Sequence, residues 1–212
     1  MNKRSILILL AISISSQAMQ QEDTKPVFQP NTLIEQTVYR LIRQFMANDS
    51  TSFSKGSTYY SFNDDIQKAL KNIDQLSITE DLKQYLSEFY KDIKDEGYSF
   101  ARNLTKVING ELQGEDRQKG LNILLSSAAH QGHENLVKFL LFLGANVNGE
   151  TGHGDTILMW AAGTDQTEIV KLLLANGANI NAKNEDGGTA LSLAEKKGFT
   201  RTANLLRENG AK

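Results

Sequence analysis

The chain has 212 residues and a formal net charge of −2, and this length suits one or two domains with a sizeable core. Its apolar share of 40% and charged share of 23% are those of an ordinary globular protein. The weak net charge provides no general attraction to nucleic acid or to a membrane surface. The absence of cysteine excludes disulfide bonds, thiol catalysis and cysteine-ligated zinc.

The first 18 residues have the three parts of an export signal. A short basic start precedes an apolar stretch over residues 6–14, and Ser16 and Ala18 are small residues at a suitable cleavage site. The apolar stretch is shorter than the roughly 20 residues that span a bilayer, although an uncleaved anchor and a buried N-terminal helix are alternatives. We predict a signal peptide over residues 1–18 and a mature protein that is exported from a bacterium-like cell, either periplasmic or secreted, without a membrane segment.

Residues 19–110 are expected to form a linker followed by a helical domain. Residues 19–30 are polar and hold both prolines, which predicts an extended linker. Over residues 31–110, apolar side chains recur at three- and four-residue steps, as on one face of a helix. Four helices are predicted, over about residues 32–45, 64–76, 78–96 and 100–108, with Gly97 ending the third. The polar segment 109–120 contains three glycines and is the predicted domain boundary.

The remainder of the chain repeats with a period of 33 residues. Alanine recurs at this interval, and so do glycine and two sets of leucines: Ala128, Ala161 and Ala194; Gly144, Gly177 and Gly210; Leu125, Leu158 and Leu191; Leu140, Leu173 and Leu206. A fixed period of this size indicates a stack of supersecondary units. Within one copy, Thr156 is placed to cap a short helix, and Gly177 permits the left-handed turn that ends the next helix.

These copies resemble the ankyrin repeat. The segments "TILMWAA", "TEIVKLLLANGANINA" and "AAHQGHENLVKFLLFLGANVN" carry the similarity, in three copies over about residues 119–150, 151–183 and 184–212. The resemblance implies an all-α fold, in which the N-terminal helical region is followed by an ankyrin-repeat solenoid. It also implies a non-enzymatic protein that binds another protein through the concave face of the stack, without identifying that partner.

Three departures from the family pattern give further expectations. The pattern's histidine is replaced by Ser126, Met159 and Ser192, which weakens the usual hydrogen bonds between helix starts, and Ile123 removes the capping hydroxyl of the first copy. Three repeats are close to the minimum for a stable stack, so we expect the N-terminal helices to pack on the first repeat. Polar or small residues in the third copy predict an outer cap with a wetter face, at Thr202, Ala203 and Arg207.

Trp160 is the main candidate for a binding residue. It is the only tryptophan, and in the ankyrin pattern its column, with Ser127 and Leu193, points into the concave groove. Tryptophan is enriched among interface hot spots, although packing between neighbouring inner helices is the alternative. The same pattern places further candidate binding residues around it, namely His130, Gln131, Gly163, Thr164, Lys196 and Lys197, and at the loop tips Gly152, His153, Asp155, Glu185 and Asp186.

The sequence offers little for catalysis or for metal binding. His130 and His133 supply two potential ligands on one helical face, but no cysteine or carboxylate cluster completes a site, and no nucleotide-binding or hydrolase motif occurs. Glu88, Asp92 and Glu96 are interpreted as a solvated helix face. We therefore predict no catalytic residue, metal or cofactor. An enzyme in the N-terminal helical region and a structural protein of the envelope remain alternatives, and the oligomeric state stays open.

Overall fold

The computed structural model describes residues 80–108 and 110–212. The signal peptide, the linker and the first two predicted helices lie outside these residues. The described regular structure is helical apart from one isolated bridge between Glu150 and Thr156, which confirms the all-α prediction for this part. No described helix has the length and apolar character needed to span a membrane.

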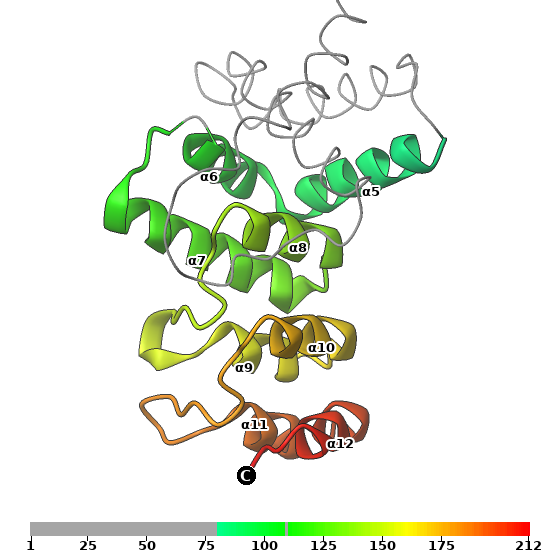
Figure 1. Ribbon diagram of the computed structural model, residues 1–212, viewed down its shortest axis with the longest axis vertical. Helices are drawn as coiled ribbons and strands as arrows, with labels where there is room; N and C mark the ends of the chain where they lie inside the picture. The colour runs from blue at the N-terminus through cyan, green and yellow to red at the C-terminus, as the bar shows by residue number, and fades with distance from the viewer. Residues whose placement is uncertain (1–79, 109) are drawn as a thin grey trace, which may run out of the picture.

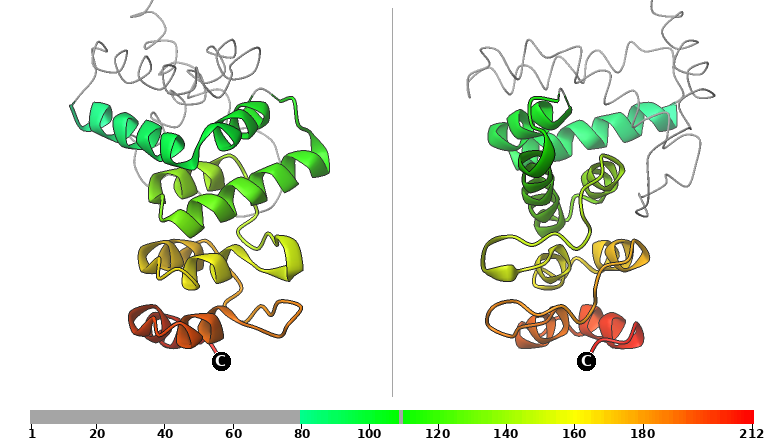
Figure 2. Two further views of the ribbon diagram at one scale, coloured as in Figure 1. Left: turned by 180° about the vertical axis from the view of Figure 1, so that it is seen from behind. Right: turned by 60° about the vertical axis from the view of Figure 1, so that its left-hand side comes forward.

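The helices lie in successive layers along the long axis of the molecule (Figure 1). The first layer holds α5 (Glu80–Glu96) and α6 (Tyr98–Ile108), and the next holds α7 (Gly114–Gln131) and α8 (Glu134–Phe142). Two shorter pairs follow, α9 (Ile157–Ala162) with α10 (Thr167–Ala175) and α11 (Ala190–Lys196) with α12 (Thr200–Glu208). The loops before α9 and α11 project to one side, and the first of them contains the 3-10 helix η2 (Gly152–Gly154) (Figure 2).

The ends of the short helices follow local rules that the sequence displays. Thr156 accepts a hydrogen bond from the amide of Met159 (3.3 Å) and caps α9, as predicted. Thr189 caps α11 in the same way, and the Thr189 amide donates a hydrogen bond to Ser192 Oγ (2.9 Å). Gly177 has a φ of +84°, which confirms the predicted left-handed turn after α10. The two threonine caps and the left-handed glycine make the helices begin and end at fixed points of the repeat.

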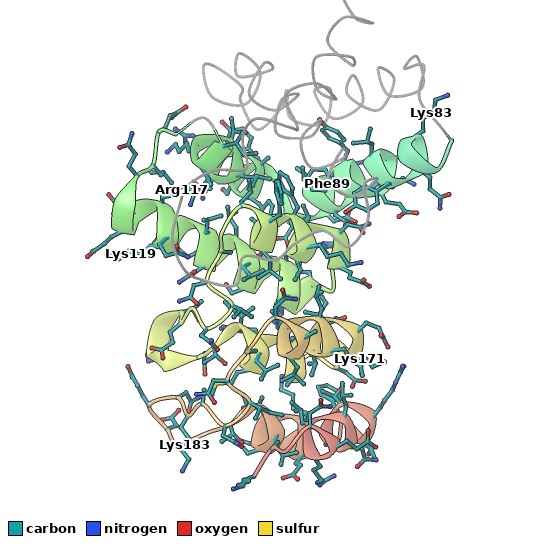
Figure 3. All side chains as sticks on the ribbon, viewed as in Figure 1. Lys83, Phe89, Arg117, Lys119, Lys171 and Lys183 are labelled. Atoms are coloured by element: carbon teal, nitrogen blue, oxygen red, sulfur yellow. The ribbon has the colours of Figure 1, made fainter. Side chains whose placement is uncertain are left out.

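The first helix pair of the repeats, α7 with α8, differs from the expectation. The sequence predicted a short inner helix with a missing cap at Ile123, but α7 is one continuous helix that begins nine residues earlier, at Gly114. Ile123 therefore lies inside α7 and needs no capping hydroxyl. Glu115 and Asp116 stand in the first turn of α7, where acidic side chains stabilise a helix through its dipole. Near this end, Arg117 Nη2 donates to the Leu143 carbonyl after α8 (2.7 Å; Figure 3).

The N-terminal helices pack on the first helix pair, as predicted. Helix α5 packs on α8 and α6 packs on α7, and one hydrophobic core continues from these helices to α12. Phe89 of α5 and Phe139 of α8 are fully buried and meet edge to face with ring centroids 5.2 Å apart (Figure 3). Helix α6 ends and α7 begins within or beside the predicted boundary segment, residues 109–120, and a division into two domains there stays a prediction.

The expected wetter face of the last repeat is correct only in part. Arg207 is exposed and pairs with Glu195 (2.6 Å), but Thr202 and Ala203 are buried. Thr202 Oγ1 lies 2.7 Å from Thr167 Oγ1 and donates to Asp165 Oδ1 (2.6 Å). The expectation fails for the two buried positions because they face the preceding helix pair, where paired hydroxyl groups satisfy each other.

Candidate functional site

An open groove runs along the inner helices of the first two helix pairs. Its volume is about 610 Å³, and it is lined by Ile123, Ser126, Ser127, His130 and Gln131 of α7 and by Trp160 of α9. The α7 residues recur at three- and four-residue steps, so they form one exposed face of that helix. The side chain of Ile123 is 60% exposed, and among the described residues it is the only large apolar side chain that is so open. The groove thus combines an apolar wall with hydroxyl, amide and imidazole groups.

Trp160 is held in a defined position at the side of this groove. Its indole Nε1 donates to Thr151 Oγ1 (2.8 Å), and the Thr151 amide in turn donates to the Asp155 carbonyl (2.9 Å). The His130 ring meets the indole at a steep angle with centroids 5.5 Å apart. Trp160 is half-buried, so one part of the ring fixes the loop before α9 and the remaining part faces the groove. No pattern in the sequence predicted this hydrogen bond between Trp160 and Thr151.

The residue pairs at the ends of α9 and α11 contact one another across the stack. Lys197 Nζ donates to the carbonyl of Gly163, which is buried (2.9 Å). Thr164 Oγ1 donates to the Trp160 carbonyl (2.9 Å) and is half-buried. Lys196 is exposed. Gly163 and Lys197 therefore join two neighbouring repeats, and Lys196 places a positive charge on the surface.

The predicted loop-tip residues come together in pairs. His153 Nδ1 lies 3.6 Å from Glu185 Oε2, and the Glu185 amide donates to the His153 carbonyl (3.1 Å). Asp155 Oδ1 accepts a hydrogen bond from Asn184 Nδ2 (2.8 Å). Gly152 and Asp186 are exposed. The two hairpin loops thus form one connected edge beside the inner helices.

Glu96 is hydrogen-bonded to two residues that line the groove, and the sequence interpretation of its helix face is wrong here. Glu96 Oε2 accepts hydrogen bonds from Ser127 Oγ (2.5 Å) and Gln131 Nε2 (3.0 Å), while Oε1 is buried and has no hydrogen-bond partner among the described residues. Burial raises the pKa of this carboxyl, and the hydrogen bond from Ser127 works against the rise. A side chain assigned to a solvated surface is therefore half-buried between α5 and α7.

Asp92, one turn before Glu96, is also drawn into the interface. Its Oδ1 lies 3.3 Å from His133 Nδ1, and both side chains are largely buried. Burial raises the pKa of Asp92, which the nearby His133 opposes. His133 Nε2 is buried and has no hydrogen-bond partner in the described part of the chain. In the part of the chain that the structure describes, no group of three acidic, histidine or cysteine side chains is arranged to hold a metal ion.

A family model for ankyrin repeats matches residues 103–212 in three copies. The chain belongs to the ankyrin-repeat family. No curated protein gives a match to it. The ankyrin match begins inside α6, so it includes all three helix pairs from α7 to α12 but leaves out α5. Ankyrin repeats are generally protein–protein interaction modules, typically without enzymatic activity.

The groove lies where the ankyrin stack meets a helix outside the family match. Of the predicted binding residues, His130, Gln131 and Trp160 line it together, while the loop-tip residues form the adjacent edge. The sequence analysis did not identify Ile123 and Ser126 as lining residues, nor Glu96 as a neighbour of the groove. Ile123 is an apolar residue on the exposed side of α7, and this could be recognised only when α7 was known to be one continuous helix. Ser127 and Gln131 lie 31 and 35 positions from Glu96 in the sequence, so no local sequence pattern predicts these contacts.

Proposed function

We propose that this ankyrin-repeat protein binds a protein partner through the groove on its inner face and through the adjoining hairpin edge. The observation that carries the proposal is the pairing of a half-buried Trp160 with an exposed Ile123 in one open groove. A large apolar side chain left exposed has a cost in water that contact with a partner removes. Tryptophan in such a position is the residue type most often found at the centre of a binding hot spot.

The fixed position of Trp160 supports the same function. Thr151 and His130 restrain the indole before any partner arrives. A side chain that is already ordered loses little conformational entropy on binding, so more of the contact energy appears as affinity. We infer a non-enzymatic role, in which the groove recognises a segment of another protein and carries out no reaction on it.

Photo-crosslinking from the groove is the sharpest test. A benzophenone amino acid is placed at Gln131, which is exposed in the groove, and at Glu208 on the outer helix α12 as the matched control. We expect one stoichiometric crosslinked protein from position 131, identified by mass spectrometry, and none from position 208. Equal or diffuse crosslinking from both positions contradicts the proposal and favours a structural role in the envelope.

Export is a second part of the proposal, supported by the basic, apolar and small-residue parts of residues 1–18. We propose that the mature protein begins at Met19 and acts in the periplasm or outside the cell. Mass spectrometry of the N-terminus in the exported fraction is expected to find Met19 first. An intact Met1 on the mature protein contradicts this.

A further inference from the structure

The groove has an apolar part and, beside it, an acidic side chain. Ile123 and Trp160 form the apolar part. The Glu96 carboxylate is not itself a lining residue, but it accepts hydrogen bonds from Ser127 and Gln131, which line the groove. Both donors are neutral, so they satisfy one oxygen atom and leave the negative charge uncompensated. The second oxygen, Oε1, is buried and accepts no hydrogen bond from any other described residue.

No described side chain forms an ion pair with Glu96. His133 is near enough to favour the charged carboxylate, but its Nδ1 is engaged with Asp92 at 3.3 Å. Taking a carboxylate partly out of water without a cation costs free energy. Glu96 also stands in the last turn of α5, where the helix dipole disfavours a negative charge. Neither the burial nor the position is compensated within the described part of the chain.

A positive charge brought close to Ser127 and Gln131 would compensate the negative charge of Glu96. A cation within about 4–6 Å of a carboxylate favours the charged form, and the attraction is stronger in a half-buried site than in bulk water. Gln131 is exposed, so its amide is free to move aside for a stronger donor. Ile123 and Trp160 line the same groove as Ser127 and Gln131, and they suit an apolar side chain of the same ligand segment.

We propose that the groove takes a partner segment that presents a lysine or arginine side chain to Glu96 and an apolar side chain to Ile123 and Trp160. This inference rests on the proposed binding function and adds the chemistry of the partner. The cation gives the segment its position along the groove, and the apolar contact provides most of the buried area. Neutral or acidic segments lack the group that neutralises Glu96.

Selection of peptides against the full mature chain tests this directly. A random-sequence peptide library is displayed on phage, and selected peptides are synthesised and titrated while the emission of Trp160, the only indole in the chain, is followed. We expect the selected peptides to share a lysine or arginine close to a leucine, isoleucine or phenylalanine. We also expect saturable changes in Trp160 emission.

Two variants separate the contribution of the cation from that of the groove. Glu96→Gln keeps one acceptor oxygen for Ser127 and Gln131 but removes the charge, and we expect it to weaken binding about tenfold. Glu115→Gln removes an equally negative but 92% exposed side chain on α7 and is expected to change the affinity less than about twofold. Citrulline in place of the peptide's arginine, or norleucine in place of its lysine, is expected to weaken binding to the native chain by about the same factor as Glu96→Gln does. The same peptide changes are expected to cause no further loss of affinity in the Glu96→Gln variant.

Each other outcome overturns the inference in a distinguishable way. If the selected peptides are neutral or acidic, or if Glu96→Gln binds as tightly as the native chain, the cation is wrong while groove binding still stands. Ile123→Asp probes the groove itself, and unchanged peptide affinity in that variant contradicts the proposed function too. If acrylamide fails to quench Trp160 in the free full-length chain, another part of the chain fills the groove and the inference falls. Thermal melts followed by circular dichroism show that each variant is folded.

Discussion

The two ends of the ankyrin stack are built by different rules. At the C-terminal end, Asn181 donates to the Gly210 carbonyl (3.4 Å) and accepts from the Lys212 amide (2.9 Å). One repeat earlier, Asn148 makes the same two contacts with the Gly177 carbonyl (3.1 Å) and the Asn179 amide (2.7 Å). This end therefore repeats a contact that the periodic sequence already specifies.

The N-terminal end of the stack instead depends on contacts that occur once. Phe89 packs on Phe139, and the carboxylates of Asp92 and Glu96 enter the interface with His133 and Ser127. The apolar contacts stabilise this junction, whereas the half-buried acids weaken it. The regular part of the molecule is thus a scaffold, and the candidate binding groove lies where the repeat pattern is interrupted.

Removing Phe89 tests how far the N-terminal helices belong to the stack. Phe89→Ala is expected to lower the free energy of unfolding by about 3–5 kcal/mol, because it leaves a cavity against α8. Leu206→Ala at the other end, also fully buried, is expected to cost roughly 2–5 kcal/mol. Urea unfolding followed by circular dichroism measures both. A Phe89→Ala variant as stable as the native chain contradicts the proposed junction.

Trp160→Ala separates binding from stability. We expect binding of the crosslinked partner to weaken by about 2 kcal/mol or more, measured by isothermal titration calorimetry. The free energy of unfolding should fall by less than in Leu206→Ala, because the indole is only half-buried. Thr151→Val is the matched control, since it removes the hydrogen bond to Trp160 Nε1 and keeps the ring. Full partner affinity in Trp160→Ala rules out the anchor role.

Gly177→Ala probes the regular end of the comparison. At a φ of +84° a Cβ is strained even though no atom lies within 4 Å of its position, so we expect a loss of about 1 kcal/mol. Gly163→Ala is an informative counterpart, because Gly163 has a negative φ of −70° but a Cβ there would lie 3.1 Å from the Met159 carbonyl oxygen. Urea unfolding gives both values. An unchanged midpoint for Gly177→Ala would show that the turn tolerates a side chain.

Glu96→Gln gives the smallest expected change in stability, and its sign depends on pH. Because burial raises the pKa of Glu96 in the folded state above its usual value near 4.5, the folded chain holds this proton more tightly than the unfolded chain. The stabilisation that this bound proton contributes to the folded chain is present at low pH and is lost as the pH rises through the raised pKa. Glu96→Gln avoids this loss, so its stability relative to the native chain should increase above about pH 4.5.

Urea unfolding of both proteins between acidic and neutral pH measures this difference. Glu115→Gln, with its exposed side chain, is expected to follow the native pH profile. A Glu96→Gln variant that is less stable than the native chain at neutral pH contradicts the view that the carboxylate is an uncompensated charge.

The repeating part of this protein could be predicted from its sequence alone. The 33-residue period, the cap at Thr156 and the left-handed glycine at position 177 depend on residues that are near one another in the chain or in register with a neighbouring copy. Such contacts are readable because a repeat places the same residue types at the same structural positions. The packing of N-terminal helices on the first repeat was also predictable, from the need to cover an apolar end.

The features that depend on single contacts between distant residues became visible only in the folded chain. The continuous helix α7 exposes Ile123, the fold buries Thr202 against Thr167, and α5 brings Glu96 to Ser127 across 31 residues. The residue types were visible in each case, but their burial was not, because it depends on which helix faces which. A carboxylate in an amphipathic helix has the same local sequence whether its face meets water or another helix, and the packing of α5 on the first ankyrin repeat settles which of these it is.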